Sequence, residues 1–258
     1  MRVTRPVQSY LTYTLGKDLY IPLTCRCNSR TLPETRGPNF MLPAPVVAAL
    51  CRVRDLELST QQWTFWCNYL DTQEGAQKLP ERPESIAVKD ENCDDNNPIT
   101  MNMLQEEIDS YLRNDKLRPN SLVFAGEGEP TLRLDEMLEL VGSLQQAHTS
   151  EALPPIRVTT NGLRPNIVSR LKDGGVSRVS IALMTADPTQ YDQLMNPSQE
   201  KGHDKVRQFI QNSIEIGLEV EATAVDRDDV DKTATQELAK SLGVDAEDVQ
   251  VRWRPYFG

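Results

Sequence analysis

Short apolar runs alternate with amphipathic stretches along the carboxyl half of the chain. The runs have the length and β-branched content of buried strands, and between them apolar residues recur at helical spacing, as at Leu134, Met137 and Val141. The expected strands are 18–25, 121–125, 156–160, 176–184, 218–225 and 249–257. Strands that alternate with helices pair in parallel through right-handed crossovers. The pattern therefore predicts an α/β fold, a partial (β/α)6 TIM-like barrel built on a parallel sheet.

A long insertion interrupts this alternation after the first expected strand. The elements expected there are, in order, a polar loop (26–40), two helices (45–58 and 61–70), an acidic solvated loop (72–98) and the helix that leads to the second strand (101–112). We expect a single domain over residues 1–258, with the insertion at about 41–98 within it. Extra core is the first interpretation of the insertion, ahead of a lid or an interface.

The charge balance limits the kinds of partner. The net charge is −10 and the pI is about 4.8, which argues against binding to a nucleic-acid backbone, although a local basic patch is possible around Arg252 and Arg254. No apolar run approaches the length of a membrane helix, and the first residues lack the pattern of a secretory signal. We expect a protein of the cytoplasm or an organelle matrix that is not secreted. The sequence does not identify its substrate or its oligomeric state.

The five cysteines are odd in number and irregularly spaced, which argues against a secreted disulfide framework. Cys25 and Cys27 stand at the end of the first expected strand, where two thiols can reach one metal. Two thiols alone are an incomplete set for zinc or for a four-iron cluster, and buried apolar filling is the alternative interpretation. We expect Cys51 and Cys67 on the core faces of helices and Cys93 in the acidic loop.

Polar residues follow several expected strands at the carboxyl edge, where β/α folds bind their ligands. The Gly-Glu-Gly-Glu-Pro turn at 126–130 has glycines that let a ligand approach the backbone and a carboxylate that can accept a bond from an ammonium group. An acidic turn into a helix explains it equally well. Thr160 and Asn161 also stand where an expected strand ends, and they fit either a ligand site or an ordinary turn. Ser180 lies inside an expected strand, and its hydroxyl either contacts a ligand or is satisfied within the core.

Five stretches carry a resemblance in their order and spacing: DLYIPLTCRCN, LVFAGEGEPTLRLDEMLELV, IRVTTNGL, VSRVSIALMTADPTQYDQLMNP and LGVDAEDVQVRWRPYF. Together they resemble the radical S-adenosylmethionine (SAM) superfamily, most closely its TatD-linked branch. The likeness runs from about Tyr13 to Gly258, apart from the insertion. It implies a partial β/α barrel of the radical SAM type, SAM as cofactor, and a 4Fe-4S cluster that cleaves SAM reductively to a 5′-deoxyadenosyl radical.

The resemblance also implies roles for individual residues. Gly128 and Glu129 would meet the amino group of SAM, and Thr160 and Asn161 would lie near its sugar and methionyl part. Val225 would line the adenine, while Arg252 and Arg254 would face the SAM carboxylate or a substrate. The expected cofactor-binding set is Gly126, Glu127, Gly128, Glu129, Pro130, Thr160, Asn161, Ser180, Val225, Arg252 and Arg254, with Cys25 and Cys27 as metal ligands.

The chain departs from this family at its Cys-x-x-x-Cys-x-x-Cys loop, which is degenerate here. Counting from Cys27, the second and third positions are Thr31 and Glu34; counting from Cys25, they are Ser29 and Leu32. Hydroxyls and carboxylates are poor substitutes for thiolates on a low-potential cluster. Neither alignment supplies three thiols.

Three hypotheses about activity remain open. The first is a radical SAM enzyme whose cluster uses a rearranged set, such as Cys25 and Cys27 with Cys51 or Cys67. The second is a non-catalytic relative that keeps the barrel and a SAM-like pocket and works as a binding or scaffold module. The third is an ordinary β/α-barrel enzyme that binds anionic metabolites through Glu129 and the two arginines of the last strand.

Overall fold

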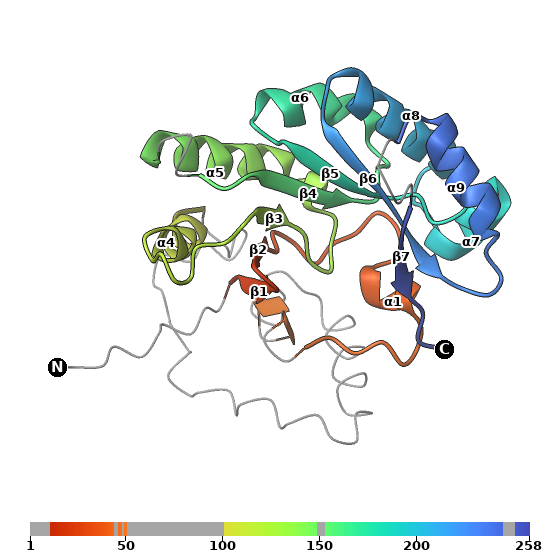
Figure 1. The fold of residues 1–258 in the computed structure, drawn as a ribbon, viewed down its shortest axis with the longest axis horizontal. Helices are drawn as coiled ribbons and strands as arrows, with labels where there is room; N and C mark the ends of the chain where they lie inside the picture. The colour runs from red at the N-terminus through yellow and green to blue at the C-terminus, as the bar shows by residue number, and fades with distance from the viewer. Residues whose placement is uncertain (1–10, 44–45, 48, 51–100, 149–152, 245–250) are drawn as a thin grey trace.

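The computed structural model describes residues 11–43, 46–47, 49–50, 101–148, 153–244 and 251–258. Its strands are β1 (Tyr13–Leu15), β2 (Asp18–Ile21), β3 (Leu122–Phe124), β4 (Ile156–Thr160), β5 (Arg178–Ala182), β6 (Glu219–Asp226) and β7 (Val251–Pro255). They form one seven-stranded sheet in chain order, in which β1 is antiparallel to β2 and all other neighbours are parallel. The sheet curls into a half-barrel (Figure 1). The predicted α/β partial barrel is confirmed.

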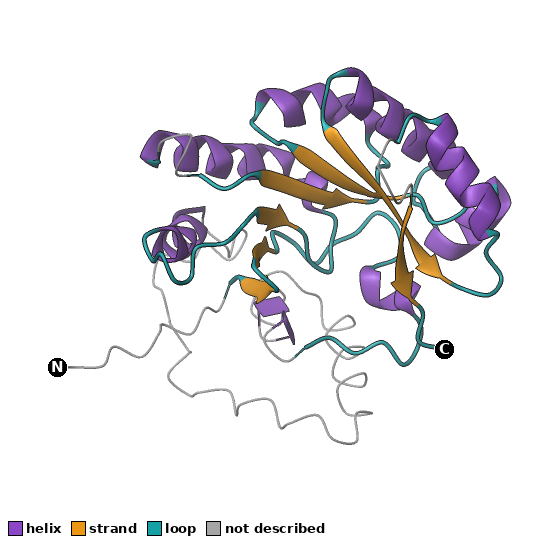
Figure 2. Cartoon of the chain, in the orientation of Figure 1, coloured by secondary structure: helices purple, strands orange, loops and turns teal. Residues whose placement is uncertain are grey.

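Helices cover the outer face of this curled sheet (Figure 2). They are α4 (Met101–Leu112), α5 (Leu134–Ala147), α6 (Val168–Asp173), α7 (Pro188–Met195), α8 (Gly202–Glu215) and α9 (Lys232–Ser241), with 3-10 turns at Pro130–Arg133 and Pro165–Ile167. Their apolar stripes face the strands; in α5 the residues Met137, Val141 and Leu144 are fully buried. Within the described residues, no helix combines the length and the apolar character needed to cross a bilayer.

All six expected strands are present, but the sequence interpretation missed β1. It contains three residues, too few to show a strand period, and two of its side chains are exposed. A two-residue turn joins it to β2, with Leu15 paired to Asp18, and Gly16 has φ +63° in that turn. Glycine at the first position of a two-residue hairpin loop is a signal that would have revealed the strand.

The expected polar loop at 26–40 contains a short helix, α1 (Leu32–Arg36). Thr31 precedes it, and the Glu34 carboxylate accepts bonds from the backbone N–H of Thr31 at 2.7 Å and from its hydroxyl at 2.9 Å. Threonine followed by glutamate three residues later is the pattern of a capping box, so a local signal for this helix was present. The prediction of a loop throughout was wrong.

Only the start of the insertion is described. Val46, Val47, Ala49 and Leu50 are helical and buried, in agreement with the first expected helix. Three of these residues form a small apolar cluster with Tyr13 of β1. The remainder of that helix, the expected helix 61–70 and the acidic loop 72–98 lie outside the described residues, so the division into one domain with an insertion stays a prediction.

The chain after β7 packs against the chain after α1 and helps to close the half-barrel. The Phe257 N–H donates to the Arg36 carbonyl at 2.8 Å, and the Asn39 N–H donates to the Phe257 carbonyl at 3.0 Å. Gly37 has φ +99°, and a Cβ there would lie 2.4 Å from the Phe257 carbonyl oxygen, so only glycine fits. This contact holds Arg36 beside β7.

Candidate functional site

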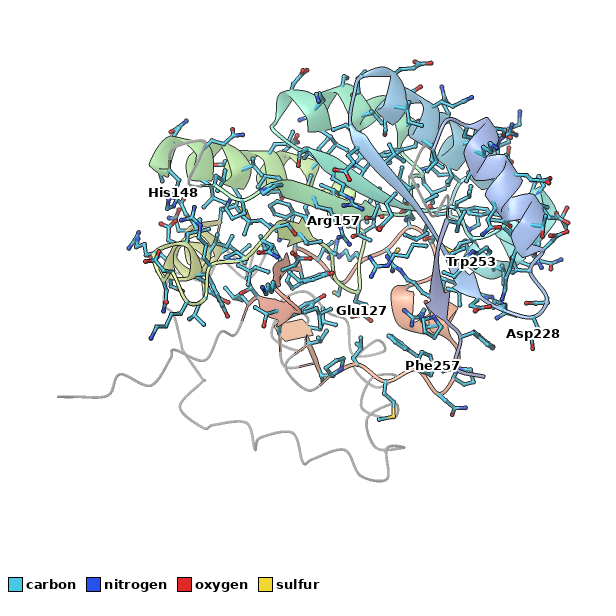
Figure 3. The ribbon with its side chains drawn as sticks, viewed as in Figure 1. Glu127, His148, Arg157, Asp228, Trp253 and Phe257 are labelled. Atoms are coloured by element: carbon cyan, nitrogen blue, oxygen red, sulfur yellow. The ribbon has the colours of Figure 1, made fainter. Side chains whose placement is uncertain are left out.

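A cavity of about 540 Å³ opens on the inner side of the half-barrel, at the carboxyl edge of the strands. Its volume is in the range of small-molecule sites. Glu127 and Arg157, which both line it, lie on the side of the sheet away from α5, α6 and α8 (Figure 3). The turns after β3 and β4 and the loop after β2 therefore open onto one cavity, as a ligand site at this edge requires.

The structure brings most of the expected site residues together. Those that line the cavity are Cys27, Gly126, Glu127, Gly128, Glu129, Thr160, Asn161, Val225, Arg252 and Arg254. Three others lie outside its lining. Pro130 is buried at the start of the 3-10 turn, Cys25 is buried, and the Ser180 hydroxyl donates to the Glu221 carboxylate at 2.6 Å, as a satisfied core hydroxyl does.

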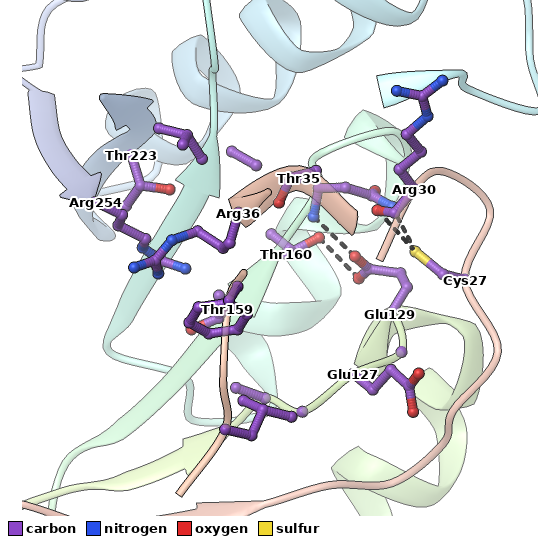
Figure 4. Close-up of a pocket in the computed structure, with 18 of the residues that line it drawn as sticks. Cys27, Arg30, Thr35, Arg36, Glu127, Glu129, Thr159, Thr160, Thr223 and Arg254 are labelled. Carbon is purple, nitrogen blue, oxygen red and sulfur yellow. Dashed lines mark hydrogen bonds between the residues drawn. The ribbon is translucent and has the colours of Figure 1, made fainter. Parts of the chain in front are cut away.

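Glu129 is held by a dense set of hydrogen bonds (Figure 4). Its Oε1 accepts from the Thr131 N–H at 3.1 Å, the Thr131 hydroxyl at 2.7 Å and the Thr160 hydroxyl at 2.8 Å, while Oε2 accepts from the Asn161 N–H at 2.8 Å. Burial raises the pKa of this carboxyl, and the four donors oppose the rise. Oε2 keeps one acceptor position for a ligand. The bonds also tie the two turns to each other.

Gly128 lets the turn after β3 approach the loop after β2. A Cβ at this position would lie 2.4 Å from the Thr24 carbonyl oxygen and 2.5 Å from that of Arg26. The Glu129 N–H donates to the same Arg26 carbonyl at 2.8 Å. Because backbone atoms surround the position, no side-chain rearrangement can make room for a methyl group.

We expect Gly128→Ala to lower the free energy of unfolding by about 1–3 kcal/mol or more, as overpacking does. Gly142→Ala is the matched control: this glycine lies inside α5, a Cβ there meets nothing within 4 Å, and the change should stabilise by about 0.5–1 kcal/mol. Urea unfolding of both variants measures the difference. Equal stabilities would mean that the close approach of the two loops is not needed in solution.

Cys27 is half-buried at the edge of the cavity. Its Sγ lies 3.5 Å from the Ser29 hydroxyl, and the Asn161 side-chain amide donates to it at 3.8 Å. The same amide donates to Asn28 at 2.7 Å, which holds the loop after β2 against the end of β4. Burial, assisted by the Glu129 charge, raises the pKa of the Cys27 thiol, so the thiol form predominates at neutral pH.

The described residues do not fit a cluster held by three thiolates. The positions that follow Cys27 at the family spacing are Thr31 and Glu34, and they bond to each other at the start of α1. No group of three or more His, Cys, Asp or Glu side chains in the described part of the chain could hold a metal ion. Cys51, Cys67 and Cys93 lie outside the described residues, so a rearranged ligand set that includes them stays a prediction.

Comparison with protein families decides the relationship. The sequence model of the radical SAM superfamily matches residues 88–231, more than half of the chain. The chain belongs to the radical SAM superfamily. Its curled, mostly parallel sheet and its cavity at the carboxyl edge of the strands therefore belong to a radical SAM fold.

Several curated relatives match part of this radical SAM chain. A Methanococcus maripaludis protein named "Probable GTP 3',8-cyclase" is 35% identical over 92 residues, which are 35% of this chain and 28% of that protein. A Methanococcus aeolicus protein of the same name is 30% identical over 128 residues, 49% of this chain and 40% of that one. The mitochondrial GTP 3',8-cyclase of Arabidopsis thaliana is 34% identical over 91 residues, 35% and 22% of the two chains. The matches thus span 40% or less of each of these relatives.

Two solved structures also resemble the radical SAM chain. A radical SAM methyltransferase from Sphaerobacter thermophilus has a TM-score of 0.43 and 18% identity, over 62% of this chain and 48% of that one. HydG, a maturase of the [FeFe]-hydrogenase, has a TM-score of 0.46 and 14% identity, over 62% and 37% of the two chains.

Arg36, Arg157 and Thr159 are among the cavity-lining residues that the sequence interpretation missed. Arg157 and Thr159 alternate along β4 with the buried Ile156 and Val158, so their polar side chains mark the inner face of the half-barrel. That alternation was visible in the sequence. Arg36 reaches the cavity only because the C-terminal chain holds the end of α1 beside β7, and no local pattern announces this contact.

Proposed function

We propose that this radical SAM superfamily member binds SAM in the cavity and acts as a SAM-binding protein without a cluster of the usual three-thiolate type. One observation carries the proposal. Most of the residues expected on the SAM side lie together around one cavity, whereas the positions expected to supply the second and third thiolates, Thr31 and Glu34, are joined by hydrogen bonds at a helix start.

The cavity offers suitable chemistry for each part of SAM. The free acceptor position on Glu129 Oε2 suits the ammonium group, since a charge-assisted bond to a carboxylate is about twice as strong as a neutral one. Gly126 and Gly128 line the same cavity, so the backbone of this turn is within reach of the methionyl part. Val225 and Ala182, which line the wall formed by β5 and β6, provide an apolar surface for the adenine.

Calorimetry with SAM, adenosine and methionine tests this proposal on the full chain without added iron. We expect SAM to bind more tightly than either fragment, because both ends of the molecule find partners in one cavity. Reconstitution with iron and sulfide under anaerobic conditions should leave the protein without a brown colour. Absence of SAM binding would contradict the proposal, whatever the result with iron.

A radical SAM enzyme is the second candidate function, and the position of Cys27 favours it. This thiol lines the cavity within reach of the Asn161 amide, next to the turn that carries Glu129. With further thiolates from Cys25 and from Cys51 or Cys67, a bound cluster would supply the electron that cleaves SAM. The similarity to GTP 3′,8-cyclases makes a purine nucleotide a reasonable first substrate to assay. Assignment to the TatD-linked branch rests on the sequence stretches alone and stays a prediction.

A further inference from the structure

Two guanidinium groups meet inside the cavity. Arg254 of β7 and Arg36 of α1 both line it, and their side chains point toward each other (Figure 4). The Arg36 Nε donates to the Pro255 carbonyl at 2.7 Å, and its guanidinium stacks 4.6 Å from the centre of the Phe40 ring. These contacts hold Arg36 in place and leave its terminal nitrogens for other partners.

Arg254 has no carboxylate partner among the described residues. Its guanidinium is largely desolvated, and the pKa of Arg254 falls to about 10 because of burial and the charges of Arg252 and Arg36. Glu221 acts on it only at longer range, as does Tyr20. Arg254 is partly exposed, and a partly desolvated charge that faces like charges without a paired carboxylate lowers stability, so an anionic ligand would stabilise this arrangement.

The carboxylates near this end of the cavity already have partners. Glu221 lies 3.3 Å from Arg178, 3.5 Å from Arg252 and 4.0 Å from Arg157, and Arg178 also pairs with Glu219 at 3.1 Å, so three guanidinium groups share two acids. Glu127 also lines the cavity, but its carboxylate points away from Arg36 and Arg254 (Figure 4). Among the described residues, a chain of net charge −10 therefore has a local excess of positive charge at the β6–β7 end of its cavity.

We propose that Arg36 and Arg254, with Arg252 at the rim, bind a phosphate group of a small-molecule ligand. The inference builds on the proposed function, in which SAM takes the Glu129 end of the same cavity. A phosphate ester carries a charge of about −1.5 to −2 and three strong acceptor oxygens, and guanidinium groups bind such oxygens in bidentate fashion. One carboxylate supplies a single charge, and a dicarboxylate carries its two charges on separate carbons, so neither offers three acceptor oxygens on one centre to two facing guanidinium groups.

Binding of inorganic pyrophosphate, GTP and malonate to the full chain tests the proposal. We expect both phosphate compounds to bind and malonate, a dicarboxylate, to bind at least about tenfold more weakly. Arg254→Met should weaken pyrophosphate binding at least about tenfold, and Arg254→Lys, which keeps the charge but not the fork, should recover part of it. Arg113→Met is the control, since its side chain, just after the end of α4, is 74% exposed.

The melting temperature separates the phosphate proposal from a purely structural role for Arg254. Arg254→Met removes a charge that faces other positive charges, so the unliganded variant should melt at the same temperature as the wild type or higher. A lower melting temperature together with unchanged pyrophosphate binding would overturn the proposal. Malonate binding as tight as that of pyrophosphate would overturn the assignment to phosphate.

The two proposals fail separately. Pyrophosphate binding that depends on Arg254, in a protein that does not bind SAM, would leave the phosphate site standing and refute the proposed function. SAM binding that survives Arg254→Met, in a protein that binds no pyrophosphate, would leave the proposed function standing and refute the phosphate site. Melting temperatures with each compound, recorded alongside calorimetry, separate these results.

Discussion

Replacing Glu129 by Gln is expected to lower the free energy of unfolding by about 2–3 kcal/mol, although the change removes only one charge. The four donors around this carboxyl need four acceptor positions. A Gln side chain would direct an amide N–H at the Asn161 N–H or at the donors of Thr131 and Thr160. A buried donor left without an acceptor costs about 1–3 kcal/mol. The loss of charge assistance adds to this cost, and relief from desolvating a charge reduces it.

Urea unfolding measures this effect, and Glu139→Gln is the matched control. Glu139 is exposed on α5, so its substitution should change the stability by less than about 0.5 kcal/mol. SAM binding to the Glu129→Gln protein should also weaken, by about tenfold or more, because the ammonium group loses a charged acceptor. A variant as stable as the wild type would mean that Glu129 is protonated in the folded protein.

The double variant Thr31→Cys/Glu34→Cys is expected to gain iron. With Cys27 it restores the spacing of the family loop, so anaerobic reconstitution should yield about four irons per chain and a brown colour, while the wild type stays without colour. The variant also loses the polar bonds at the start of α1, which should cost about 1 kcal/mol of stability before the metal binds.

Iron and acid-labile sulfide content of protein prepared without air measures this gain. The control Thr31→Ser/Glu34→Gln keeps polar groups at the start of α1 but adds no thiol, and it should take up no more iron than the wild type. If the wild type itself binds about four irons and Cys27→Ala abolishes the colour, cysteines outside the described residues complete a cluster. The second candidate function would then replace the first.

Local patterns in the sequence were sufficient for most of the fold. Apolar runs separated by helical periods predicted six strands and the helix Met101–Leu112 with its observed bounds, because burial of a strand or a helix face needs the same residues wherever it occurs. The shortest elements, β1 and α1, were missed despite their turn and capping signals. Three to five residues are too few to show a period, so only the turn chemistry marks them.

The candidate site was predictable in part. Glu129, Thr160 and Asn161 stand at strand ends, and parallel strands bring such ends to one edge, so their common cavity follows from the topology. The hydrogen bonds that Thr160 and Asn161 donate to Glu129 did not follow from the topology. Ser180 is also a strand residue of the expected set, yet its hydroxyl bonds to Glu221 outside the cavity lining, because its partner comes from the next strand.

The sequence by itself determined the α/β half-barrel and the turns at the carboxyl edge, since each depends on residue type and spacing along the chain. Only the tertiary structure decided that Glu129 is bound by four donors and that Arg36 faces Arg254. Those relations join α1, β4 and β7, which are far apart in the chain. Their energies depend on distances across the fold, and spacing along the sequence does not encode such distances.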